Sequence, residues 1–95
     1  MKVVVFFIAQ GLCIGELIEE FETENNFKIK NPALVITRAN EFMLAPFLQL
    51  VEEDTITVDK KDIAFKSYFT PKRELWNNYS RIFGSGIISA DALPL

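Results

Sequence analysis

Histidine is absent from this chain, and cysteine occurs once among its 95 residues. Without histidine the chain lacks the commonest general base and metal ligand, so we expect neither an enzyme nor a metal site, and no cofactor. The single Cys13 excludes an internal disulfide, and its place in an apolar segment predicts a small buried side chain rather than a nucleophile. This cysteine usage fits a reducing cytoplasm.

Long apolar runs and excess positive charge are also missing. The run over residues 3–9 is too short to span a membrane and is short for a secretion signal, so its valines and isoleucine predict a buried strand. Ten Lys and Arg face thirteen Asp and Glu, a net charge of −3. This balance argues against broad binding of duplex nucleic acid, which needs many basic groups, and leaves room for a local basic patch.

Apolar residues, in contrast, are abundant. They make up 49% of the chain and include nine phenylalanines. A chain of this size buries only about 60–70% of its unfolded surface. We therefore expect one small domain, part of whose apolar surface is covered by a partner in an oligomer.

A polar turn is predicted over residues 22–26. The segment ends in Asn25 and Asn26, residues that bond their own backbone and tolerate left-handed conformations. Phe27 and Ile29 then alternate with lysines, which is typical of a strand with one buried face. The segment is therefore read as strand, turn and strand.

A second hairpin is predicted around the polar residues 59–62. Residues 55–58 alternate in polarity before this turn, and residues 63–69 alternate again after it. Lys60 and Lys61 lie in the turn. An ordinary solvated turn is the alternative to a functional role for this pair.

A helix is predicted after Pro71. Leu75, Tyr79 and Ile82 recur at helical spacing, and Gly84-Ser85-Gly86 is expected to end the helix after about three turns. Its aromatic stripe should pack the helix onto the rest of the chain or onto a neighbouring subunit, and it consists of Trp76, Tyr79 and Phe83.

These segments resemble the two signature motifs of the Sm-like family, whose members form RNA-binding rings. The second turn resembles the second motif through Lys60 and Lys61. The block from Glu74 to Ile87 is similar to the small Sm-like proteins of marine cyanophages. The residues that match the first motif are Gly11, Gly15, Glu16, Leu17, Phe21, Glu22, Asn25, Asn26, Phe27 and Ile29.

The resemblance implies an all-β fold, namely a strongly bent five-stranded antiparallel open barrel with a short C-terminal helix and tail. The Sm-like barrel would comprise residues 1–70, and the helix and tail residues 71–95. The expected strands lie at residues 2–9, 12–22, 26–38, 42–51 and 55–69.

The resemblance also implies a closed homo-oligomeric ring of roughly five to seven subunits. In such a ring the fourth strand of one subunit pairs with the fifth strand of the next. We expect Phe47, Leu48 and Phe65 at the subunit contact.

The function implied by the resemblance is binding of short single-stranded RNA at the ring pore, by a phage-encoded protein in the cytoplasm of the infected cell and with no membrane partner. The amides of Asn25 and Asn26 and the charges of Lys60 and Lys61 would form the site. Glu24, Asp59 and the acidic balance favour an alternative, a structural or assembly ring with protein partners and no RNA site.

Overall fold

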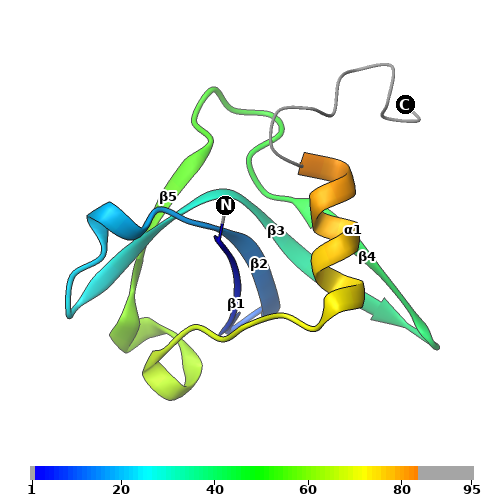
Figure 1. The fold of residues 1–95 in the computed structure, drawn as a ribbon, viewed down its shortest axis with the longest axis horizontal. Helices are drawn as coiled ribbons and strands as arrows, with labels where there is room; N and C mark the ends of the chain where they lie inside the picture. Colours follow the sequence, from blue (N-terminus) through cyan, green and yellow to red (C-terminus); the bar gives the residue numbers. More distant parts are fainter. Residues whose placement is uncertain (1, 84–95) are drawn as a thin grey trace.

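The structure is a computed structural model and describes residues 2–83. This part of the chain is mostly β-structure, and one helix follows the strands (Figure 1). The strands are β1 (Lys2–Ile8), β2 (Gly11–Leu17), β3 (Asn26–Arg38), β4 (Glu41–Pro46) and β5 (Thr55–Asp59), and the helix is α1 (Arg73–Phe83). The connections contain the 3-10 helices η1 (Glu19–Phe21), η2 (Lys60–Asp62) and η3 (Ala64–Lys66). None of the helices within residues 2–83 is long and apolar enough to cross a membrane.

β3 is the longest strand and organises the antiparallel sheet. One of its sides pairs with β2, and the other pairs first with β5, starting from Asn26 opposite Asp59, and then with β4. The change of partner falls at Asn31 and Pro32. Asn31 has φ 51° and donates its N–H to the Asp54 carbonyl at 2.7 Å. Pro32 has no N–H to contribute to a ladder, so the partner can change here without breaking a bond.

A glycine controls how closely β2 and β3 approach. The register of β2 shifts between Ile14 and Glu16, and Gly15 lies at the shift. A Cβ atom on Gly15 would lie 2.1 Å from Cγ2 of Ile29, so the buried Ile29 side chain or one of the strands would have to move. A side chain at position 15 is therefore expected to be costly.

The predicted strongly bent barrel is wrong, because the sheet is open and not strongly curled. Its order is β1-β2-β3-β4, with β5 joined to β3. The outer edge of β1 meets the later chain at a single bridge, where Val5 and Phe69 exchange backbone hydrogen bonds of 2.8 and 2.7 Å. Closure would need a continuous ladder at that edge. The fold is a mostly β, five-stranded antiparallel sheet with one C-terminal helix.

Three of the predicted strands extend too far, and the second and fourth are the simpler cases. The strand expected over residues 12–22 ends at Leu17, because η1 follows it. The strand expected over residues 42–51 ends at Pro46, whose missing N–H suits a strand end.

The predicted second hairpin is also wrong. The strand expected over residues 55–69 ends at Asp59, and β5 pairs with β3 instead of with the chain that follows it. The later segment forms η3, where Phe65 and Lys66 have φ of 64° and 53°. These positive values exclude an extended strand, so the alternation of apolar residues there did not indicate β-structure.

Each face of the sheet carries an apolar core. Alternation along β1 sends Val4 and Phe6 to one face and Val3 and Val5 to the other. α1 covers the second face, on the side of the molecule away from the turn that precedes β3 (Figure 1).

Tyr79 anchors α1 on the sheet. Its side chain is fully buried, and its hydroxyl donates to the carbonyl of Asn31 at 2.8 Å, at the point where β3 changes partner. Leu75 and Phe83 pack beside it. Trp76 is 41% exposed and is not covered within residues 2–83, so its packing against a neighbouring subunit stays a prediction. The expected helix stop at residues 84–86 lies outside the described residues.

Candidate functional site

Two turns lie side by side at one end of the sheet, because β3 begins where β5 ends. Asn26 pairs with Asp59 in the ladder between these strands. The backbone N–H of Lys60 donates to the Asn25 carbonyl at 2.9 Å, which joins residues 22–26 to η2. The structure thus brings together the residues assigned to RNA from the sequence, Asn25, Asn26, Lys60 and Lys61.

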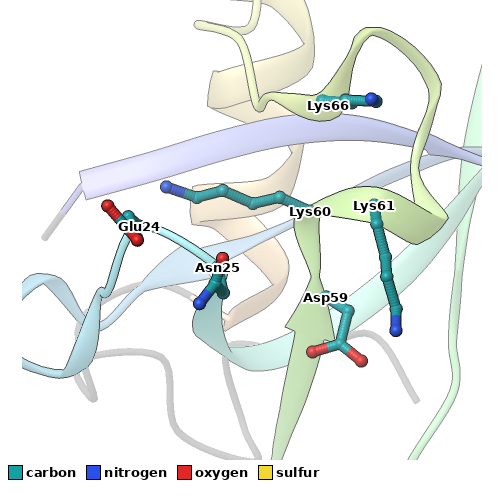
Figure 2. A pocket seen from close by; sticks show the side chains of 6 residues that line it. All are labelled: Glu24, Asn25, Asp59, Lys60, Lys61 and Lys66. Carbon is teal, nitrogen blue, oxygen red and sulfur yellow. The ribbon is translucent and has the colours of Figure 1, made fainter.

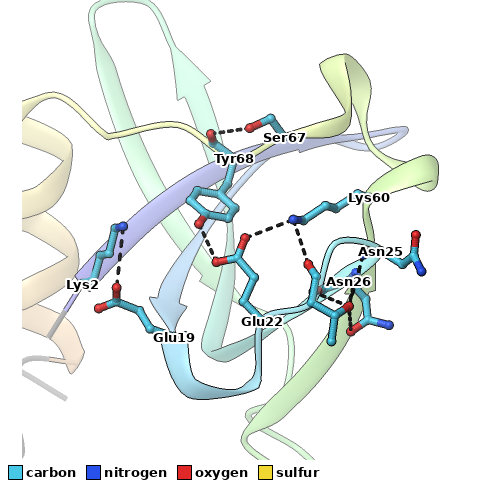
Figure 3. Close-up of polar contacts among 9 residues, drawn as sticks. Lys2, Glu19, Glu22, Asn25, Asn26, Lys60, Ser67 and Tyr68 are labelled. Carbon is cyan, nitrogen blue, oxygen red and sulfur yellow. Dashed lines mark hydrogen bonds and ion pairs between the residues drawn. The ribbon is translucent and has the colours of Figure 1, made fainter.

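Thr23 holds the first turn. Its Oγ1 accepts the backbone N–H groups of Asn25 and Asn26 at 3.1 and 3.0 Å, and lies 3.3 Å from Oδ1 of Asn26 (Figure 3). Neither asparagine has a positive φ. The turn therefore depends on the threonine hydroxyl and not on left-handed asparagines. The Asn25 side chain is left exposed, whereas Asn26 is half-buried and bonded within the turn.

Lys60 connects the two turns through its side chain. Its Nζ donates to Oε2 of Glu22 at 3.0 Å and to the carbonyl of Thr23 at 2.9 Å, and Tyr68 donates its hydroxyl to Oε1 of Glu22 at 2.7 Å (Figure 3). The hydrogen bonds from Tyr68 and then Lys60 lower the pKa of Glu22. The same hydrogen bond raises the pKa of Tyr68 to about 12, because the hydroxyl must keep its proton to donate to Glu22, and partial burial of the hydroxyl adds to the shift. The charge of Lys60 is therefore used mainly to hold the two turns together.

A hollow of about 480 Å³ lies between the turns, and we refer to it as the two-turn hollow (Figure 2). Within residues 2–83, Lys60 is paired with Glu22, while Lys61 and Lys66 are in no ion pair. The hollow has mixed charge, since two of its side chains are carboxylates. It is lined by Glu24, Asn25, Asp59, Lys60, Lys61 and Lys66.

Lys66 was missed by the sequence reading, which placed it on a strand. The left-handed conformation of Phe65 and Lys66 reverses the chain after η2 and returns Lys66 to the hollow. No local signal predicts such a conformation, because neither residue is glycine or asparagine.

The three residues expected at a subunit contact lie in two different places. Phe47 and Leu48 follow the end of β4, and Phe47 is 39% exposed. Phe65 belongs to η3 and is 77% exposed. Its ring contacts those of Phe7 and Phe69 instead.

The structure of residues 2–83 gives no support for a metal site or for a reactive cysteine. No group of three or more acidic, histidine or cysteine side chains there could hold a metal ion. Burial raises the pKa of Cys13 to about 11, so this thiol is a poor nucleophile at neutral pH.

Comparison with known proteins does not assign this chain to a family. No protein-family model matches the sequence. A search of the curated proteins also finds no match. The resemblance to Sm-like proteins therefore stays a prediction.

Proposed function

We propose that the protein binds short single-stranded RNA in the two-turn hollow. The observation that carries this proposal is the placement of Lys61 and Lys66, which are exposed, come from separate turns and line one hollow with the exposed amide of Asn25. The lysines of the hollow extend in different directions in Figure 2. A compact anion would meet only one of them, whereas a phosphodiester chain can meet them in succession while the amide bonds a base edge.

The charge of the hollow favours a single strand over a duplex. Glu24 and Asp59 offset part of the lysine charge, so each subunit neutralises few phosphates. Single-stranded RNA can supplement such weak backbone binding with contacts to its exposed bases. Binding by one subunit should therefore be weak and dependent on salt.

An oligomer would strengthen this binding, because several hollows on one assembly act together on one RNA. We propose a closed homo-oligomer, with roughly five to seven subunits as the resemblance implies. Within residues 2–83, β4 pairs only with β3, so its outer edge is open to a second copy. Exposed apolar side chains along and after that edge support association, namely Met43, Phe47, Leu50 and Val51.

A protein-binding assembly role is the second candidate, and an apolar groove favours it. This groove has a volume of about 500 Å³ and lies between the sheet and the start of α1, away from the two-turn hollow. Val5, Leu12, Phe42, Phe69 and Leu75 contribute to its lining. The groove is mostly apolar, although Lys72 is among its lining residues, and it suits an apolar protein side chain better than a nucleic-acid strand.

Direct binding measurements separate the two candidates. Fluorescence anisotropy at low salt should detect binding of labelled oligouridine or oligoadenine of about ten nucleotides. A duplex of the same length serves as the control and should bind more weakly, although its charge density is higher. Failure of the wild-type protein to bind any short RNA would favour the assembly role.

A further inference from the structure

Phe65 presents an aromatic ring to solvent and directly precedes Lys66, which lines the two-turn hollow. Its side chain is 77% exposed, the largest exposed fraction among the aromatic residues within 2–83. Its ring lies edge to face against Phe7 and Phe69, with centroid distances of 6.0 and 5.9 Å. These contacts support one part of the ring and leave the remainder uncovered.

The backbone at this position is unusual for so large a side chain. Phe65 has φ 64° and ψ 3°, and Lys66 follows with φ 53°. A bulky residue with positive φ is uncommon, and two successive non-glycine residues of this kind are more so. Strained conformations of this type concentrate at binding sites, where they aim a side chain. Here the strain displays Phe65 and at the same time returns Lys66 to the hollow.

An aromatic ring next to cations is the combination with which proteins bind single-stranded nucleic acids. Bases stack on the ring while lysines meet the phosphates, and this mode depends little on sequence. Lys66 is the next residue along the chain, and Lys61 lines the same hollow. The adjacent positive charge favours a nucleobase on Phe65 over an apolar protein side chain, since a phosphate travels with each base.

We propose that Phe65 stacks on a base of the single-stranded RNA whose phosphates lie against Lys61 and Lys66. This inference rests on the proposed function and assigns a residue to it that was expected at the subunit contact. Phe65 would then contribute to affinity through the base and not through charge.

Four proteins test the stacking role: wild type, Phe65→Ala, Phe65→Tyr and the control Trp76→Ala, which removes an exposed aromatic ring from α1. Anisotropy with oligouridine should show binding weakened by at least about fivefold for Phe65→Ala. The tyrosine variant should retain most of the affinity, and the Trp76 control should bind as wild type does. The salt dependence should be the same for all four, because no cation is lost.

An abasic oligonucleotide with the same phosphates separates stacking from assembly. Phe65→Ala should bind it as wild type does, at an unchanged mass in analytical ultracentrifugation. If Phe65→Ala binds oligouridine normally while wild type binds RNA, the stacking role is overturned and the proposed function stands. If the variant changes mass and loses the abasic ligand as well, Phe65 belongs to a subunit contact instead. Absence of RNA binding by wild type would overturn both.

Discussion

Lys60 Nζ lies 3.0 Å from Oε2 of Glu22, across 38 positions of sequence. The two side chains are only 21% and 27% exposed. Because Tyr68 bonds the other carboxylate oxygen, Glu22 joins the turn before β3 to η2 and to the segment after η3. This arrangement holds together the segments that form the two-turn hollow. Its contribution to the free energy of unfolding can be measured without RNA.

Replacing Lys60 should destabilise the fold. In Lys60→Met the apolar stem is kept, but Glu22 loses a charged donor while it remains partly covered. We expect a loss of about 1–2 kcal/mol in the free energy of unfolding, measured with urea. Lys61→Met is the matched control and should change it by less than about 0.5 kcal/mol, since Lys61 is exposed and unpaired within residues 2–83. Equal effects of the two variants would contradict the structural role of Lys60.

Stability should also depend on pH through Glu22. The pKa of Glu22 is lower in the folded protein, chiefly because Tyr68 and then Lys60 donate hydrogen bonds to it. The resulting stabilisation is present above the unfolded pKa of about 4.3 and is lost as pH falls through the lower folded pKa. Urea unfolding between neutral and acidic pH should therefore show a smaller acid loss for Glu22→Gln and for Tyr68→Phe than for wild type. Parallel curves for all three proteins would refute the coupling.

Gly15→Ala should destabilise the sheet. Its Cβ would lie 2.1 Å from Cγ2 of Ile29, so the buried Ile29 side chain must leave its position or β2 and β3 must move apart. A loss of about 1–3 kcal/mol is expected from such overpacking, together with a lower melting temperature by circular dichroism. An unchanged melting temperature would mean that the strands approach less closely than described.

Phe47→Asp tests the proposed oligomer. Phe47 is exposed in the single chain, so the substitution should leave the monomer folded. In an assembly that covers this position it would bury an unpaired charge, and sedimentation should show dissociation to monomers. Phe21→Asp, at an exposed position of η1, is the control and should leave the mass unchanged. A wild-type protein that is monomeric at micromolar concentration would contradict the oligomer itself.

Local patterns predicted much of the secondary structure. The apolar run of β1 and the alternation at Phe27 and Ile29 mark real strands, because one face of each is buried. The helical spacing of Leu75 and Tyr79 marks α1, because this face packs on the sheet. Burial of one face of a strand or helix produces a periodic pattern of apolar residues, and this pattern can be recognised in the sequence.

Properties set by distant contacts could not be read in the same way. The open sheet results from the pairing of β5 with β3. The alternation of residues 63–69 is compatible with a strand that pairs with β5 as well as with η3, so the sequence alone could not separate the two. The ion pair between Lys60 and Glu22 joins residues 38 positions apart, so a pattern of neighbouring residues cannot predict it. Lys66 reaches the hollow through a conformation that its residue type does not indicate.

The most direct test of the RNA site compares the salt dependence of oligouridine binding for two double variants of equal charge. Lys61→Ala with Lys66→Ala removes the two cations of the two-turn hollow that are in no ion pair within residues 2–83, and Lys72→Ala with Arg73→Ala removes two exposed cations at the start of α1. We expect the first pair to weaken binding and to reduce the slope of log affinity against log salt by about 1.4 for each hollow that the RNA occupies, and the second pair to leave the slope unchanged. Equal slopes for both variants and wild type would contradict RNA binding in the two-turn hollow.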